Sequence, residues 1–186
     1  KYVNSGSDIV FACTFGANRI KLSEYGLENE LNTLNKKLVE ISKNADKTQY
    51  YVAGDVAPTG RFVEPFGDLK FEGAVSVFKE QIAALVSGGA DLIVIETMMD
   101  IQETRAALIA AKEICNLPVM VTMTFSDEGR TLTGTDSITA LITLQSLGAD
   151  AFGCNCSTGP ESMIKLIEGI KPYAKIPLIA KPNAGL

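Results

Sequence analysis

Six short apolar runs recur along the chain, and each is followed by a cluster of polar residues. The runs are rich in valine and isoleucine and apolar at successive positions, which is typical of parallel strands buried on both faces. They lie at residues 8–14, 50–55, 91–96, 118–124, 149–156 and 176–182. The pattern therefore predicts six strands of one parallel sheet.

The segments between these runs carry apolar residues at helical spacing. Such stripes extend from Leu31 to Ile41, from Phe78 to Leu85, from Ile138 to Ile142 and from Met163 to Ile167. We expect Asp136 or Ser137 to cap the third of these helices and Pro160 to open the fourth. Strands that alternate with helices indicate βα units.

The fold class predicted from this alternation is α/β, and we interpret it as a (β/α)8 TIM barrel. A complete barrel needs about 250 residues, whereas this chain has 186 and six strands. We therefore expect an incomplete barrel of about six of the eight βα units, lacking the first strand and the last βα unit. A doubly wound sheet is the alternative, but no G-x-G-x-x-G motif follows the first run.

Composition excludes several classes of partner. The chain has 17 basic and 22 acidic residues and a net charge of −5, so we expect no nucleic-acid partner and no basic membrane-binding patch. No apolar run approaches the ~20 residues that span a bilayer, and the N-terminal residues have no signal-peptide core. Four cysteines are too sparse for a disulfide framework, which favours reduced thiols and a cytoplasmic location.

The chain contains no histidine. A Ser-His-Asp or Cys-His mechanism therefore cannot be assembled from these residues. Any metal site must use cysteine, carboxylate, amide or backbone ligands.

Polar residues follow the ends of the predicted strands, where the active sites of barrels lie. Thr97, Asp100 and Ser157 can serve equally as helix caps or as site residues. Glu96 ends a fully apolar run, so its carboxylate must lie at the edge of the core and needs a partner. That partner is either a cationic group of a ligand or, in a purely structural pair, Lys181 or Arg130.

Free cysteines usually pack as small buried hydrophobic residues. This is the expectation for Cys13 inside a strand, for Cys115 on a helix and for Cys154. Cys156 is expected on the same strand face as Cys154, but at the strand end, before a Gly-Pro helix start that favours a thiolate. The residues alone thus indicate a barrel enzyme with a reactive cysteine, because a C-x-C pair is a weak zinc signal.

Several motifs, in the same order along the chain, resemble the homocysteine S-methyltransferase family. The segment that carries most of the resemblance is GCNCSTGPE at residues 153–161. Others are at residues 5–28, GDVAPTG at 54–60, ETMMDIQETRAAL at 96–108, MTFSDEGRTLTGTD at 123–136 and KPNAG at 181–185. The motifs are most similar to the N-terminal homocysteine-binding module of the cobalamin-dependent methionine synthases, and residues 1–186 are expected to be a fragment of that domain.

The resemblance implies a barrel whose zinc ion is held by three cysteine thiolates. The first maps to Cys156, and the other two are an adjacent pair in a G-G-C-C-G segment that the 186 residues do not contain. Asn183 matches an asparagine at the metal rim, a candidate oxygen ligand. Zinc would present homocysteine as a thiolate to an electrophilic methyl group, and we expect the fragment alone to be inactive.

The resemblance also implies how homocysteine is bound. Glu96 matches the glutamate that binds its amino group, and the turn of Thr14, Phe15, Gly16 and Ala17 matches the loop whose backbone amides meet its carboxylate. In the methionine synthase context the methyl donor is methylcobalamin, regenerated from methyltetrahydrofolate, so the partners are cobalamin- and folate-binding modules of the same protein. Enzymes that use betaine or S-methylmethionine, or a TIM-barrel lyase or aldolase with a Schiff-base lysine, are the alternatives.

Overall fold

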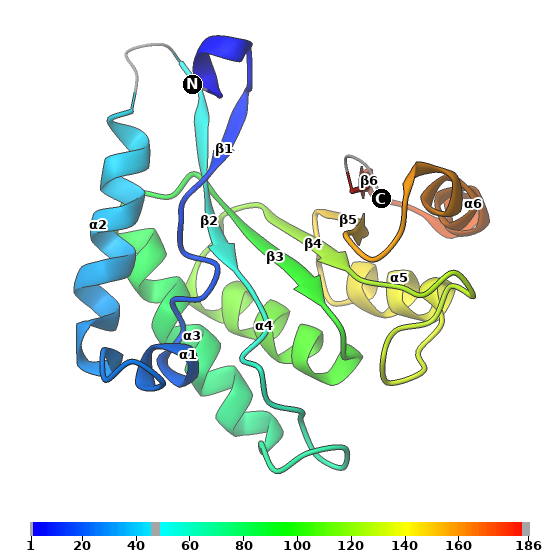
Figure 1. The fold of residues 1–186 in the computed structure, drawn as a ribbon, viewed down its shortest axis with the longest axis horizontal. Helices are drawn as coiled ribbons and strands as arrows, with labels where there is room; N and C mark the ends of the chain where they lie inside the picture. The colour runs from blue at the N-terminus through cyan, green and yellow to red at the C-terminus, as the bar shows by residue number, and fades with distance from the viewer. Residues whose placement is uncertain (1, 46–48, 184–186) are drawn as a thin grey trace.

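The six predicted strands form one parallel sheet in a computed structural model that describes residues 2–45 and 49–183. The strands are β1 (Ile9–Phe11), β2 (Tyr51–Val56), β3 (Leu92–Met98), β4 (Val119–Met123), β5 (Ala151–Asn155) and β6 (Leu178–Lys181). They are hydrogen-bonded in chain order, β1 to β6, with every pair parallel (Figure 1). This order confirms the prediction of an incomplete (β/α) barrel and excludes the doubly wound alternative, whose strand order would reverse.

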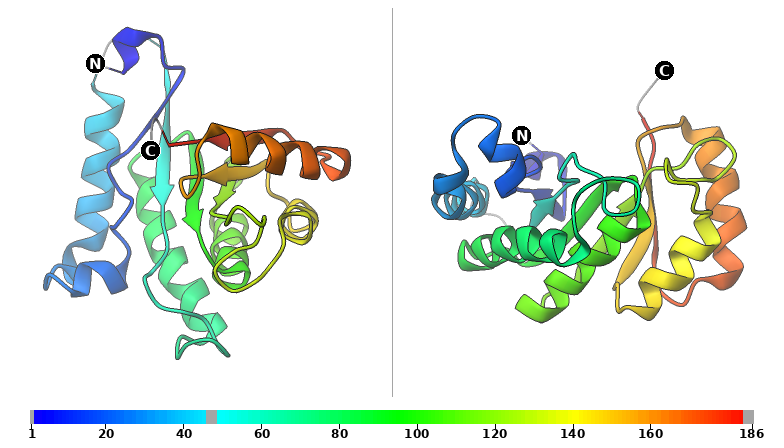
Figure 2. Two further views of the ribbon diagram at one scale, coloured as in Figure 1. Left: turned by 45° about the vertical axis from the view of Figure 1, so that its right-hand side comes forward. Right: turned by 90° about the horizontal axis from the view of Figure 1, so that it is seen from below.

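Helices cover one face of this sheet (Figure 2). They are α1 (Arg19–Ser23), α2 (Leu31–Lys43), α3 (Phe71–Ser87), α4 (Ile101–Ile114), α5 (Ser137–Ser146) and α6 (Pro160–Ile170), with 3-10 turns at Val3–Ser5, Glu28–Glu30 and Lys171–Tyr173. Asp136 caps α5 by accepting a hydrogen bond from the Thr139 amide at 3.0 Å, and Pro160 opens α6, both as predicted. The stripe predicted on α2 is wrong at its end, because Ile41 is exposed and Val39 is buried instead.

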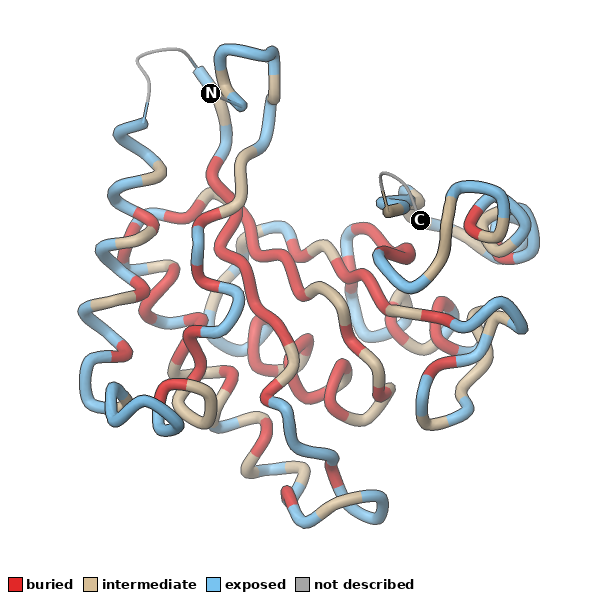
Figure 3. The backbone as a smooth tube through the Cα atoms, viewed as in Figure 1, coloured by how far each residue is buried: buried red, intermediate tan, exposed pale blue. Residues whose placement is uncertain are grey.

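The sheet has two different apolar faces. Its convex face packs against the helices in the main core, to which Phe78 and Leu85 of α3 and Leu144 of α5 contribute. A smaller cluster of Ala53, Leu92 and Val94 lies on the concave face, without any helix residue. Buried residues run along the strands in Figure 3, which explains why the strand sequences are apolar at successive positions.

The sheet is curled, so that its first and last strands approach each other at their carboxyl ends. The Lys181 ammonium, at the end of β6, lies 4.3 Å from the centre of the Phe11 ring on β1. β5 and β6 also pack closely, because a Cβ atom added at Gly153 would overlap the Ile179 carbonyl oxygen. The curl brings polar residues from distant strands to one rim.

Within the described residues, no helix combines the length and the apolar character needed to cross a membrane. The last two residues of the KPNAG motif, at 184 and 185, lie outside the described part of the chain.

Candidate functional site

Polar side chains line the concave face where the strands end, and we call this edge the rim. Successive side chains of a strand point to opposite faces. Ala53 and Val94 belong to the concave cluster, and Met120 packs against it. The residues two positions further along each strand therefore face the same side, at the rim: Asp55 on β2, Glu96 on β3 and Thr122 on β4. By the same alternation, Asn155 on β5 and Lys181 on β6 also face the concave side, because Cys154 and Leu178 pack in the opposite core.

Glu96 is paired within the protein. Its carboxylate accepts a short hydrogen bond and ion pair from the Lys181 ammonium, and its side chain is only 12% exposed. The same ammonium lies over the Phe11 ring, an arrangement that attracts a cation to the negative face of the ring. Of the two intramolecular partners considered for Glu96, Lys181 is therefore the one found, and the pair marks a position at the rim that holds an ammonium group.

Two polar groups beside Glu96 are buried without a partner in the described structure. Asp55 is 5% exposed and its Oδ1 has no hydrogen bond, and Thr122 is 1% exposed and its Oγ1 has none. The pKa of Asp55 is raised to about 8, chiefly by burial and also by the negative charge of Glu96, while the positive charge of Lys181 opposes the shift. Unpaired buried polar groups are costly, so their gathering at one rim indicates a binding site.

Asp55→Asn should change how stability depends on pH. Because the pKa of Asp55 is raised on folding, the folded protein holds a proton that the unfolded chain loses, and stability falls as pH rises toward about 8. From about pH 6 to about pH 9 the wild type should lose about 3 kcal/mol more than Asp55→Asn. Urea unfolding at each pH measures this, with the exposed Asp127→Asn as control; equal slopes for wild type and Asp55→Asn would contradict the expectation.

Asn155 links two segments of the rim that lie far apart in sequence. Its Oδ1 accepts a hydrogen bond from the Thr97 amide at 3.0 Å, and its Nδ2 donates to Thr97 Oγ1 at 2.8 Å and to Cys156 Sγ at 3.2 Å. The Cys156 amide donates to the Lys181 carbonyl at 3.2 Å. The Cys156 thiol is thereby fixed beside Thr97, the neighbour of Glu96.

Backbone strain is concentrated at the same place. Thr97, Cys156 and Ser157 are the non-glycine residues with positive φ in the described chain, at 60°, 56° and 59°. Each such residue costs on the order of 1 kcal/mol, and strain of this kind clusters at functional sites. A register shift between Ile95 and Met98 adds a bulge to β3 at Glu96 and Thr97.

The cysteines differ from prediction in two respects. Cys154 packs in the main core, where burial raises its thiol pKa to about 11, whereas Cys156 is exposed beyond the strand end. The positive φ of Cys156 breaks the strand alternation, so the expected shared face is wrong. Cys13 is also not inside a strand; it follows β1 and is exposed. Cys115 is the half-buried residue that ends α4.

The predicted carboxylate-binding turn lies at the end of β1. Thr14 is buried, and its Oγ1 donates to the Asp55 carbonyl at 2.8 Å, which fastens the turn to β2. The Thr14 amide donates to Ala12 and the Ala17 amide to Thr14 within the turn. In the described structure, the amides of the exposed Phe15 and Gly16 have no acceptor, so these two are available to a ligand.

The described residues contain no group of three histidine, cysteine or carboxylate side chains that could hold a metal ion. Cys156 is exposed at the rim, and the half-buried Asn183 follows Lys181, whose carbonyl binds the Cys156 amide. One thiol and one amide suit part of a zinc site.

Other polar residues of the motifs have structural roles. Asp100 caps α4 by accepting a hydrogen bond from the Gln102 amide at 3.1 Å. The buried Glu103 accepts hydrogen bonds from both the amide and the hydroxyl of Thr59, at 2.7 and 2.6 Å, which ties the GDVAPTG loop to α4. Burial raises the pKa of Glu103, although these bonds oppose the shift.

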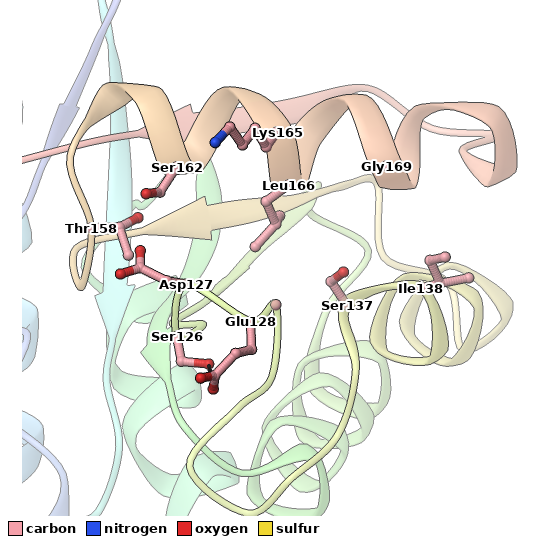
Figure 4. A pocket seen from close by; sticks show the side chains of 11 residues that line it. Ser126, Asp127, Glu128, Ser137, Ile138, Thr158, Ser162, Lys165, Leu166 and Gly169 are labelled. Carbon is pink, nitrogen blue, oxygen red and sulfur yellow. Dashed lines mark hydrogen bonds between the residues drawn. The ribbon is translucent and has the colours of Figure 1, made fainter.

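A separate polar pocket lies between the loop after β4 and α6. Asp127 and Glu128 of the loop and Lys165 of α6 contribute charged side chains to its lining (Figure 4). None of the predicted site residues lines it, so this pocket is distinct from the rim of the concave face.

Sequence reasoning missed three features of the rim: the bridging role of Asn155, and the unpaired burial of Asp55 and Thr122. A signal existed for Thr122, because a hydroxyl inside the apolar run PVMVTMT must point to one face of the sheet. The contact between Lys181 and Phe11 left no signal, because it depends on how strongly the sheet curls.

Comparison with known proteins identifies relatives of the whole chain. The profile of the family described as Homocysteine S-methyltransferase matches residues 1–186. Two methionine synthases, from Mycobacterium leprae (strain TN) and Mycobacterium tuberculosis (strain ATCC 25618 / H37Rv), are 29% and 30% identical over the full chain. The chain spans only 16% of the length of either.

Solved structures of a homocysteine methyltransferase share the fold of this chain. The homocysteine methyltransferase MmuM from Escherichia coli, in its oxidized form, superimposes with a TM-score of 0.85 and 22% identity, over 99% of this chain and 68% of MmuM. Its apo form gives a TM-score of 0.76 over the same shares. With the family profile matching every residue from 1 to 186, the chain belongs to the homocysteine S-methyltransferase family.

Proposed function

We propose that this chain forms the homocysteine-binding part of an enzyme that transfers a methyl group to the homocysteine thiol, giving methionine. The observation that carries the proposal is the Asn155 bridge, which holds the Cys156 thiol beside Thr97 and Glu96. Homocysteine has a thiol at one end and an amino group at the other. A cysteine that can help to hold a metal and a carboxylate that can bind an ammonium group, both at one rim, would bind these two ends. Family membership supports this assignment.

Zinc is the metal that this proposal requires. Cys156 would supply one thiolate and Asn183 an oxygen ligand in the absence of substrate, with two further thiolates from residues outside this sequence. Bound zinc would ionise the substrate thiol at neutral pH, and an open coordination position would receive it. The absence of histidine is consistent with this chemistry, because no general base is needed.

The residues of this chain would orient the substrate. Glu96 would bind the amino group, and the free amides of Phe15 and Gly16 would meet the carboxylate. Thr14 and Ala17 would act indirectly, because their amides are engaged within the turn and Thr14 is fastened to β2.

We further propose methylcobalamin as the methyl donor, regenerated from methyltetrahydrofolate on cobalamin- and folate-binding modules of the same protein. The methionine synthase relatives, of which this chain matches 16%, support the donor and the modular arrangement. Betaine or S-methylmethionine would be the donor in the alternative. Incubating the full-length, zinc-loaded protein with homocysteine and each donor in turn distinguishes them, and methionine formed only from methylcobalamin supports the proposal.

A Schiff-base lyase is disfavoured by the position of Lys181. Its side-chain nitrogen is engaged in the ion pair with Glu96 and lies over the Phe11 ring, whereas an imine-forming lysine must present a free amine to a carbonyl substrate. Borohydride trapping of a carbonyl substrate on a zinc-free protein would overturn the methyltransferase proposal.

Glu96→Gln should weaken homocysteine binding while leaving zinc bound. The amide keeps the shape of the side chain but lacks the charge that pairs with an ammonium, so KM should rise about tenfold or more. Steady-state kinetics and zinc content of the full-length protein measure both effects. Loss of zinc from this variant, or an unchanged KM, would show that Glu96 does not bind the amino group.

A further inference from the structure

Three oxygen acceptors lie on adjacent strands of the concave face at the rim. Glu96 on β3 is flanked by Asp55 on β2 and by Thr122 on β4. Asp55 and Thr122 each have a fully buried oxygen atom without a hydrogen bond in the described structure.

Strand register places the three acceptors close together. Asp55 is paired with Val94, and Glu96 is the next residue of β3 on the same face. On the other side, Ile95 pairs with Val121 and Met98 with Met123, so Glu96 and Thr97 together oppose the single residue Thr122. The bulge thus sets Glu96 beside Thr122, between two unpaired groups.

A primary ammonium group has three N–H donors and no acceptor. A carboxylate, a second carboxyl oxygen and a hydroxyl are a matching set, and Phe11 adds an aromatic face nearby. The Lys181 ammonium already occupies one part of this site, where it binds Glu96 and the Phe11 ring. Its side chain remains 41% exposed, which leaves it a path to solvent.

We propose that Asp55, Glu96 and Thr122 together bind the α-ammonium group of the substrate, and that the Lys181 ammonium binds Glu96 in the free protein and leaves when the substrate enters. The inference rests on the proposed function, because it takes homocysteine as the ligand. It adds two specificity-determining residues, Asp55 and Thr122, and an internal cation that the substrate must displace.

The test compares two thiols that differ only in the amino group. Dissociation constants of L-homocysteine and of 4-mercaptobutanoate, which lacks the amine, are measured on the full-length zinc-loaded protein. Asp55→Leu and Thr122→Val should each lower the preference for homocysteine over the amine-free thiol by about tenfold, since each removes one oxygen acceptor and keeps the approximate shape of the side chain. Thr122→Ser, which keeps the hydroxyl, should retain the wild-type preference for homocysteine. Lys181→Met, which removes the competing ammonium, should raise that preference. Thr104→Val, at a buried threonine on α4, is the matched control.

Each result has a defined meaning. If Asp55→Leu and Thr122→Val weaken the binding of both thiols to the same extent, with melting temperatures showing folded protein, the ammonium site is overturned. A lower preference for homocysteine in Lys181→Met would overturn the displacement. If the wild type binds neither thiol, the proposed function itself is wrong and the inference falls with it.

Discussion

Cys156→Ser in the full-length protein is expected to abolish zinc retention and to reduce methyl transfer about a thousandfold or more. The thiol of Cys156 is the exposed one at the rim that Asn155 holds in place by a hydrogen bond at 3.2 Å. A serine hydroxyl preserves the size of the side chain and its bond to Asn155, but it is a poor zinc ligand at neutral pH. Zinc content by mass spectrometry and methionine formation measure the two losses.

The other cysteines provide matched controls. Cys154→Ala removes a buried thiol from the main core, so it should cost on the order of 1 kcal/mol of stability and leave zinc content unchanged. Cys13→Ala removes an exposed thiol just after β1 and should change neither the stability nor the zinc content. If Cys154→Ala loses zinc and Cys156→Ser retains it, Cys154 and not Cys156 is the zinc ligand.

Asn155→Ala should have the second largest effect, on both stability and activity. The substitution leaves the Thr97 amide without its acceptor and removes the support of two residues with positive φ. We expect a loss of about 3 kcal/mol in the free energy of unfolding, and about a hundredfold in activity through a misplaced thiol. Chemical denaturation and zinc affinity measure these effects separately.

Asn155→Asp separates the two functions of the amide. The carboxylate still accepts from the Thr97 amide but cannot donate to Thr97 Oγ1 or to Cys156 Sγ. Stability should therefore fall less than in Asn155→Ala, while zinc affinity falls by a similar factor. Full zinc affinity in both variants would refute a positioning role for Asn155.

The sequence predicts the fold well because its strands are defined by burial on both faces. Runs such as DLIVIE are short, apolar at successive positions and rich in β-branched residues, which favours a buried strand of a parallel sheet, and β3 lies at this run. Helix capping depends on residues close together in the sequence, so the predicted starts of α5 at Asp136 and of α6 at Pro160 are confirmed. The positions of Glu96 and Cys156 at the rim follow from the same reading, because each ends an apolar run.

The rest of the site depends on interactions between strands. The positive φ of Cys156 separates its thiol from that of Cys154, and no strand periodicity predicts such a turn. The bulge that sets Glu96 beside Thr122 arises from the register of β3 against β4. The Lys181 contact with Phe11 joins the two ends of the sheet, so it exists only once the sheet has curled.

The most direct test of the account is zinc-edge X-ray absorption of the full-length protein with L-selenohomocysteine, whose selenium marks the substrate atom. If the rim around Cys156 binds the substrate through a metal, a zinc–selenium distance should appear and should be absent in Cys156→Ser. Tight binding of the selenol without any zinc–selenium contact, or an unaltered contact in Cys156→Ser, would contradict the account.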